Sequence, residues 1–190
     1  MDILLVRHGE ILSNLKKVYA GKSSEALTEK GVLQAEILSQ KLKSEYNVHA
    51  MYSSPIQRAV QTAELISELT GIDYKIDYSF RELEMGPWEG MAESEVAEQY
   101  PEEWEIWNIR PAELKLPGRE TLDELLERVL KGLGRIYDDE RDRTIVVVTH
   151  VAIIRVLLLW HAKQTLNGYK KIYVPNAEVF EININTVPSG

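Results

Sequence analysis

Short apolar runs alternate with longer amphipathic segments along the chain, and this alternation predicts its elements. Residues 3–6 are all apolar and are followed by charge, as expected of a buried strand. Further strands are expected at about 48–53, 74–78, 144–148 and 177–184. The run at 144–148 is the clearest of these, because every one of its residues is β-branched. Five strands are therefore expected.

Between these runs, apolar residues recur at helical spacing. Helices are expected at about 28–46, 55–69, 121–138 and 151–161, the first with Thr28 as its N-cap. Strands that alternate with helices in this way predict an α/β fold with a mainly parallel sheet. Sheets of this kind bind ligands beyond the carboxyl ends of their strands, so polar residues that directly follow a strand are candidate site residues.

Residues 92–113 do not fit the alternation. They have a helical composition broken by Pro101 and Pro111, and are expected to form an excursion from the main sheet of a single domain that spans the whole chain, residues 1–190. Trp104 and Trp107 lie three residues apart, the spacing of one helical face. Packing of this segment onto the domain is their expected role, and a roof over a binding site is the alternative.

Composition and charge exclude several classes of function. The chain has 190 residues, a formal net charge of −8 and no cysteine, which argues against a nucleic-acid binder, an anionic-membrane binder, disulfides and thiolate catalysis. The apolar start is too short for a signal peptide, and the apolar run at 151–160 is interrupted by Arg155 and too short to span a membrane. A soluble, cytoplasmic protein is expected.

Two basic residues at predicted strand and helix ends could bind and attack a phosphoryl group. His8 follows the first strand, between Arg7 and Gly9, and glycine there permits close backbone approach to a ligand. A neutral imidazole can attack phosphorus, and a guanidinium can hold two phosphoryl oxygens. Arg58 lies in the first turn of a predicted helix, where its charge and the helix dipole would act on one anion. Solvated surface residues are the plain alternative for each.

A second histidine and a pair of glutamates complete the candidates. His150 follows the clearest strand and precedes an apolar helix, so it is either a core histidine or a donor to a phosphoryl oxygen. Cleavage of a phosphate ester also needs an acid that protonates the leaving oxygen. Glu82 and Glu84 lie in a glycine-containing loop, and residue chemistry alone does not choose between them. His49 and His161 have no comparable setting and receive no role.

Together these segments resemble the motifs of the histidine phosphatase superfamily, also called phosphoglycerate mutase-like. The resemblance covers nearly the whole chain in the family's order, and the joint match is far more specific than any single motif. The matching segments are residues 5–10 with Asn14, 27–31 with Gln34 and Ala35, 53–63, 82–90 around Trp88, 117–121 with Arg128 and Val129, and 149–155.

The resemblance implies a three-layer α/β/α sandwich around a mixed, mainly parallel sheet. It also implies that His8 accepts the phosphoryl group and that Glu82, rather than Glu84, donates the proton. Arg7, Arg58 and His150 would hold the phosphate, assisted by Asn14. One departure stands out: Val151 and Ala152 follow His150, where the family often has glycine. A β-branched residue resists positive φ and narrows the space near the phosphate.

The function expected from these observations is a phosphomonoesterase that acts on a small phosphorylated metabolite through a phosphohistidine. No metal or cofactor is expected, because the sequence lacks a His-Glu-x-x-His motif and a cluster of acidic ligands. The first alternative is a phosphoglycerate mutase, disfavoured because the chain ends without a basic segment that could cover the site. The second is a non-catalytic phosphate-binding module. The identity of the substrate and the oligomeric state are left open.

Overall fold

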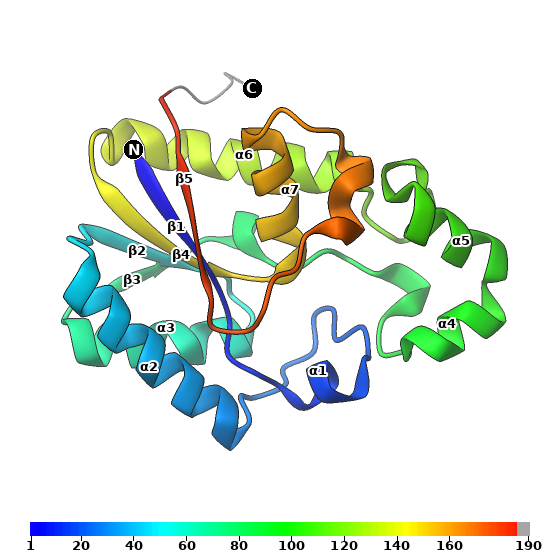
Figure 1. Cartoon of the computed structure of the whole chain (residues 1–190), viewed down its shortest axis with the longest axis horizontal. Helices are drawn as coiled ribbons and strands as arrows, with labels where there is room; N and C mark the ends of the chain where they lie inside the picture. Colours follow the sequence, from blue (N-terminus) through cyan, green and yellow to red (C-terminus); the bar gives the residue numbers. More distant parts are fainter. Residues whose placement is uncertain (186–190) are drawn as a thin grey trace.

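The computed structural model describes residues 1–185, and its centre is a five-stranded sheet with the order β3-β2-β4-β1-β5 (Figure 1). The pairs β1–β4, β4–β2 and β2–β3 are parallel, and β5 runs antiparallel to β1. The mixed, mainly parallel sheet expected from the sequence is thus confirmed. The strands are β1 (Asp2–Arg7), β2 (Ala50–Ser53), β3 (Tyr74–Ile76), β4 (Thr144–Thr149) and β5 (Val179–Asn183).

Helices cover both faces of the sheet because its central strands are apolar on both faces. Leu4 and Val6 of β1 pack with α2 (Glu29–Glu45) and α3 (Gln57–Thr70) in one core. Ile3 and Leu5 point the other way and pack with α6 (Leu122–Asp139) and α7 (Val151–His161) in a second core. Figure 1 shows these two helix pairs on opposite sides of the sheet, which makes the fold a three-layer α/β/α sandwich.

Strand register determines where the candidate histidines meet. β1 and β4 pair from Asp2 with Thr144 to Arg7 with Thr149, so the two strands end at the same level. The backbone N–H of His8 then donates to the carbonyl of Thr149, 3.0 Å away. The residue that follows each strand, His8 or His150, therefore lies at the same edge of the sheet, although the two are far apart in the sequence.

The helical excursion at 92–113 consists of α4 (Glu93–Gln99), α5 (Pro101–Ile109) and a 3-10 turn, η3 (Pro111–Glu113), which extend away from the sheet (Figure 1). Both prolines begin an element, as a residue without a backbone N–H can do at little cost. The indole rings of Trp104 and Trp107 each lie 6.4 Å from that of the buried Trp88, which confirms their packing role. Trp107 also lines a pocket, so the alternative role holds for that residue as well.

The remaining elements are short. They are the helix α1 (Leu12–Lys16), which the sequence pattern did not predict, and the 3-10 turns η1 (Tyr78–Phe80), η2 (Gly86–Trp88) and η4 (Leu166–Lys171).

The last residues of the chain, 186–190, on which part of the argument against a mutase depended, lie outside the described residues. Within residues 1–185, no helix combines the length and the apolar character that a membrane crossing requires.

Candidate active site

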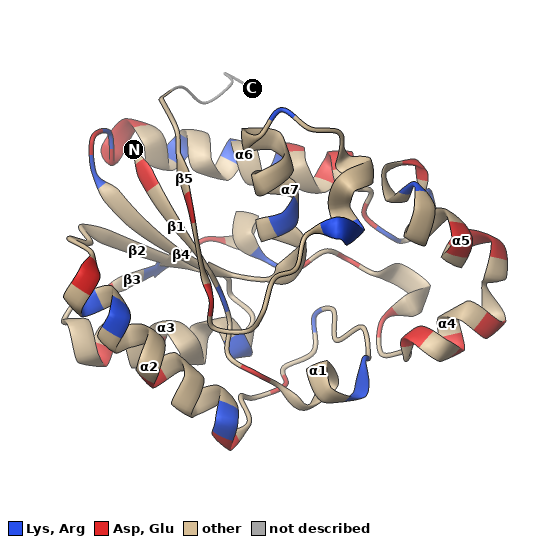
Figure 2. Ribbon diagram, viewed as in Figure 1, with Lys and Arg blue, Asp and Glu red and all other residues tan. Residues whose placement is uncertain are grey.

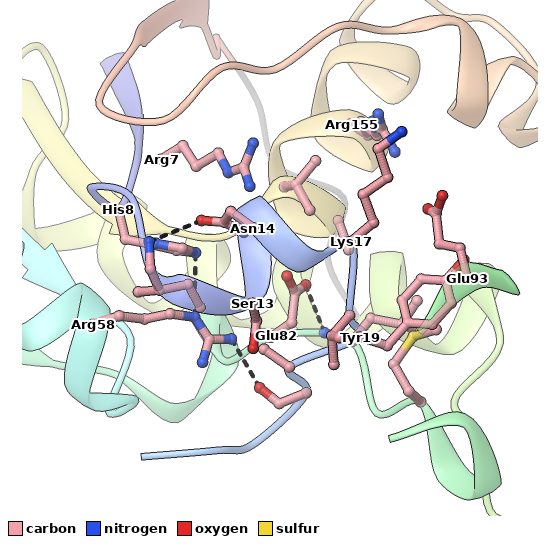
Figure 3. A pocket seen from close by; sticks show the side chains of 18 of the residues that line it. Arg7, His8, Ser13, Asn14, Lys17, Tyr19, Arg58, Glu82, Glu93 and Arg155 are labelled. Atoms are coloured by element: carbon pink, nitrogen blue, oxygen red, sulfur yellow. Dashed lines mark hydrogen bonds between the residues drawn. The ribbon is translucent and has the colours of Figure 1, made fainter. Parts of the chain in front are cut away.

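A pocket of about 330 Å³ opens at the carboxyl end of β1 (Figure 3). Side chains from the β1 end, α1, α3, α7, η4 and the loop before α4 reach it because the chain returns to this edge of the sheet after most of its strands. The structure brings five of the six predicted site residues into its wall: Arg7, His8, Asn14, Arg58 and Glu82. The sixth, His150, is fully buried next to the ring of His8.

The hydrogen bonds of His8 determine which ring nitrogen carries its proton. Arg58 Nε lies 3.2 Å from His8 Nε2, and because a guanidinium can only donate, Nε2 is the acceptor and carries no proton. Nδ1 then donates to the carbonyl of Gly9, 2.7 Å away. Burial lowers the pKa of His8 well below its ordinary value, and the charges of Arg58 and Arg7 lower it further. His8 is therefore a neutral imidazole with the lone pair of Nε2 beside Arg58.

Two arginines supply the positive charge around His8. Arg58 is only 1% exposed, and its terminal nitrogens donate to the carbonyls of Ser23 at 3.2 Å and Gly21 at 2.8 Å, so its Nε–H is directed at His8. One terminal nitrogen of Arg7 donates to the carbonyl of Val174. Burial lowers the pKa of Arg7 to about 10, so its guanidinium remains cationic at neutral pH. Burial also lowers the pKa of Arg58, and the charge of Glu82 opposes that shift.

His150 packs against His8. The centroids of the two rings are 5.2 Å apart, and His150 is fully buried. Its Nε2 lies 2.7 Å from Ser54 Oγ, whereas its buried Nδ1 has no hydrogen-bond partner within residues 1–185. Ser54 Oγ also accepts from the backbone N–H of Ile56. If the Ser54 hydroxyl donates to Nε2, the proton of His150 resides on Nδ1, which is then a free donor next to His8.

The structure distinguishes the two glutamates that residue chemistry alone could not. Glu82 lines the pocket, and burial raises its pKa although Arg58 and Arg7 attract its ionised form. Glu84 lies 3.1 Å from the Nζ atom of Lys22 and 3.4 Å from Arg81. Burial would raise the pKa of Glu84, but these cations outweigh burial and lower it. Only Glu82 combines access to the pocket with a raised pKa, as a proton donor requires.

Asn14 is held in the pocket wall by a residue that the sequence analysis missed. Asn14 Oδ1 accepts from the backbone N–H of Ile11 at 3.2 Å and from Asn176 Nδ2 at 3.0 Å, which leaves the Asn14 amide nitrogen for a ligand. Asn176 Nδ2 also donates to the carbonyl of His8, 3.0 Å away. No motif around Asn176 could have singled it out, because its position depends on the path of the chain into β5.

Glycine at position 9 is required by its packing against α2. A Cβ atom there would lie 2.4 Å from the carbonyl oxygen of Gly31, in the first turn of that helix. The departure at Val151 and Ala152 causes no backbone strain. Both residues line the pocket, but Val151 is the first residue of α7 and is not among the residues with positive φ, so its branched side chain causes no backbone strain there.

Within residues 1–185, no group of three or more His, Asp or Glu side chains is arranged to hold a metal ion. The positive charge in the pocket comes from guanidinium and ammonium groups. Such groups suit an anionic ligand, and a guanidinium can hold two oxygens of a phosphoryl group.

Comparison with known proteins identifies chains with the same architecture. The family model described as histidine phosphatase superfamily (branch 1) matches residues 3–187. The phosphoglycerate mutase-like protein 4 of Arabidopsis thaliana is 31% identical over 95% of this chain and 79% of its own. The phosphoserine phosphatase 1 of Hydrogenobacter thermophilus is 33% identical over 83% of this chain and 74% of its own. The solved structure of Bacillus stearothermophilus YhfR superposes with a TM-score of 0.91 at 25% identity, covering 98% and 92% of the two chains.

Some relatives are much longer. The chain spans 43% of the length of the mycobacterial relatives that it matches, which include a protein of Mycobacterium tuberculosis named as bifunctional, at 33% identity over 82% of this chain.

Proposed function

The chain belongs to the histidine phosphatase superfamily, branch 1, and on that premise we propose that it hydrolyses small phosphomonoesters through a phosphohistidine formed on His8. The relatives named as phosphoserine phosphatases support hydrolysis of a small phosphorylated metabolite. The observation that carries the proposal is the state of His8: it is neutral, and its unprotonated Nε2 lies between two arginines at the base of a pocket.

In the first step, the lone pair of His8 Nε2 attacks phosphorus and forms a P–N bond while the P–O bond to the leaving alcohol breaks. Glu82, in its carboxylic-acid form, gives its proton to the departing oxygen. Arg58 Nε, released from Nε2 as the P–N bond forms, and Arg7 donate to the equatorial oxygens, where charge spreads in the transition state. Nδ1 keeps its proton and its bond to the Gly9 carbonyl, which stabilises the imidazole once it carries the phosphoryl group.

In the second step, Glu82 is a carboxylate and takes a proton from a water molecule that attacks phosphorus. The P–N bond breaks, and its electron pair returns to Nε2 of His8. Asn14 and the Nδ1–H of His150 are the further donors that we assign to the phosphoryl group. The arginines carry the electrostatic role that a metal ion has in other phosphatases, so activity should persist in excess chelator.

The test is to trap the intermediate. Wild-type protein quenched during turnover of a nitrophenyl phosphate in excess chelator should carry acid-labile phosphate on the peptide that contains His8. His8→Ala should abolish turnover and trapping, because no nucleophile remains, and His161→Ala is the matched control. Phosphate on another residue, or activity that needs an added metal ion, would contradict the mechanism. Transfer of the phosphoryl group to phosphoglycerate, with little release to water, would indicate a mutase instead.

A further inference from the structure

The end of the pocket away from His8 carries charged groups that phosphoryl transfer does not use. In Figure 3, Lys17, Glu93 and Arg155 lie at that end, whereas His8 and Arg58 lie at the other. Lys170 also lines the pocket, and the charges of Glu93 and Arg155 both affect its pKa. We refer to Lys17, Glu93, Arg155 and Lys170 as the outer cluster.

The outer cluster is assembled from four separate elements. Lys17 follows α1, Glu93 begins α4, Arg155 lies on α7 and Lys170 lies on η4. Figure 2 shows basic residues at the end of α1, on α7 and on η4, and acidic residues along α4 and α5. The overall charge of −8 therefore does not describe this end of the pocket.

Two of the cations are held in place by contacts with neighbouring residues. Arg155 Nε donates to the carbonyl of Ile172 at 2.9 Å, and its guanidinium carbon lies 4.9 Å from the ring centroid of Tyr169. The Nζ atom of Lys170 lies 5.2 Å from the ring centroid of Trp107. Stacking on aromatic rings reduces the conformational entropy that these long side chains would lose when they bind a ligand.

Lys17 has a backbone conformation that is unfavourable for lysine. Its φ of 54° and ψ of 45° are left-handed, a conformation that crowds the Cβ atom of an L-residue against the following carbonyl oxygen. The conformation turns the chain at the end of α1 and brings the Lys17 carbonyl to the backbone N–H of Glu93, 3.0 Å away. This backbone contact links the two residues, and both line the pocket.

The members of the outer cluster make no ion pair within 4 Å of one another or of any other residue in the range 1–185. Three cations against one carboxylate give this end a net charge of +2. Burial lowers the pKa of Lys170, Glu93 opposes the shift and Arg155 adds to it. An anionic group between these cations would relieve their mutual repulsion.

The geometry points to a subsite for a carboxylate that has an ammonium group on the neighbouring carbon: Lys17, Arg155 and Lys170 bind the carboxylate, and Glu93 binds the ammonium. This proposal rests on the phosphatase activity proposed above and assigns its substrate class, the phosphate esters of small amino acids. The planar fork of Arg155 matches a carboxylate. The pocket is at the small end of the usual range for ligand sites, about 300 to 1,000 Å³, and so suits a short substrate.

Three substrates distinguish the proposed contact with the carboxylate from the proposed contact with the ammonium group. O-phosphoserine carries both groups, 3-phosphoglycerate has a hydroxyl in place of the ammonium, and phosphoethanolamine lacks the carboxylate. We expect kcat/KM of the wild-type protein for O-phosphoserine to exceed the other two by about tenfold or more, since a hydrogen bond to a charged group has about that effect. A nitrophenyl phosphate, which has neither group, reports on the phosphatase activity itself.

Two variants test the assignments. Lys17→Met should lower kcat/KM about tenfold for O-phosphoserine and 3-phosphoglycerate, and much less for phosphoethanolamine. Glu93→Gln should lower it about tenfold for O-phosphoserine and phosphoethanolamine, and not lower it for 3-phosphoglycerate. The matched controls are Lys16→Met and Glu98→Gln, because both residues are exposed and neither lines the pocket.

Equal losses with all substrates in either variant would overturn the subsite, as would a wild-type protein that does not distinguish O-phosphoserine from the other two. Wild-type protein that hydrolyses none of the four compounds would instead contradict the proposed function. Hydrolysis of the nitrophenyl phosphate without the expected substrate pattern would contradict the subsite alone.

Discussion

At the scale of single residues, the environment gives Glu82 and Glu84 opposite protonation tendencies. They are two positions apart in one loop, yet burial raises the pKa of Glu82, while Lys22 and Arg81 lower that of Glu84. The backbone N–H groups of Leu83 and Ala152 oppose the shift of Glu82 but do not reverse it. A raised pKa keeps more of the Glu82 carboxyl group protonated near neutral pH, and this is the form that gives a proton to a leaving alcohol.

Glu82→Gln should therefore have an effect that depends on the leaving group. General acid–base catalysis contributes about 100- to 10,000-fold, so hydrolysis of an alkyl phosphate should slow by about that factor. Release of nitrophenolate, which departs without a proton, should slow much less in a single turnover. A burst of nitrophenolate and a slow steady rate should follow, because the second step lacks its base.

Glu84→Gln is the matched control for this experiment and should show neither effect. Equal losses for the two substrates in single-turnover measurements of Glu82→Gln would show that Glu82 is not the acid. A leaving-group dependence in Glu84→Gln would transfer the role to that residue.

At the scale of elements, α6 holds the Glu82 loop through one arginine. Arg128 forms a bidentate ion pair with Glu120, in which both N···O distances are 2.7 Å. The same guanidinium donates to the carbonyls of Ser79 at 2.6 Å and Arg81 at 3.1 Å. The conformation of the loop that carries Glu82 is thus tied to a helix on the outer layer of the sandwich, which explains why residues around 120 and 128 belong to the motif set.

Arg128→Lys should loosen this loop although it preserves the charge, because an ammonium cannot reproduce the fork. We expect the free energy of unfolding to fall by about 1 to 3 kcal/mol, the cost of leaving buried polar groups unpaired. We also expect alkyl phosphates to lose more activity than a nitrophenyl phosphate. Denaturant unfolding and steady-state kinetics measure the two effects.

Arg141→Lys serves as the control for Arg128→Lys, because Arg141 is 62% exposed and lies 3.9 Å from Asp138, an arrangement that contributes about 0 to 1 kcal/mol. An Arg128→Lys variant as stable and as active as this control would refute the anchoring role of Arg128.

At the scale of the whole molecule, the two buried histidines make folding depend on pH. The pKa values of His8 and His150 both lie well below the ordinary value of 6.5, chiefly because of burial. Below about pH 6.5 the unfolded chain binds protons at these positions that the folded chain does not. The free energy of unfolding therefore falls as the pH is lowered from 6.5 towards the folded pKa values.

Each histidine should contribute a slope of up to about 1.4 kcal/mol per pH unit in this range. Denaturant unfolding of His150→Gln between pH 7 and 5.5 should show a shallower loss of stability than the wild type, and His8→Gln should behave in the same way. The exposed His161 provides the control, since His161→Gln should retain the wild-type slope. Parallel slopes in all four proteins would mean that neither buried histidine is kept neutral by the fold.

The sequence by itself determined the strands, the main helices and the positions of Arg7, His8 and His150 at strand ends. These features depend on local hydrophobic periodicity and on where charge interrupts it. The resemblance to the family motifs added Arg58, Asn14 and Glu82 to the predicted site residues. Boundaries shifted by one to two residues at several elements, as with β2, which begins at Ala50 rather than 48.

Only the tertiary structure decided which side chains share a surface. It placed the buried His150 against His8, separated Glu82 from Glu84 by burial and by cation partners, and brought Asn176 and the outer cluster to the pocket. Side-chain burial and charge neighbours depend on contacts between segments far apart in the chain. A local pattern carries no information about those contacts, because they are fixed by the pairing of β1 with β4 and by the loops that close over it.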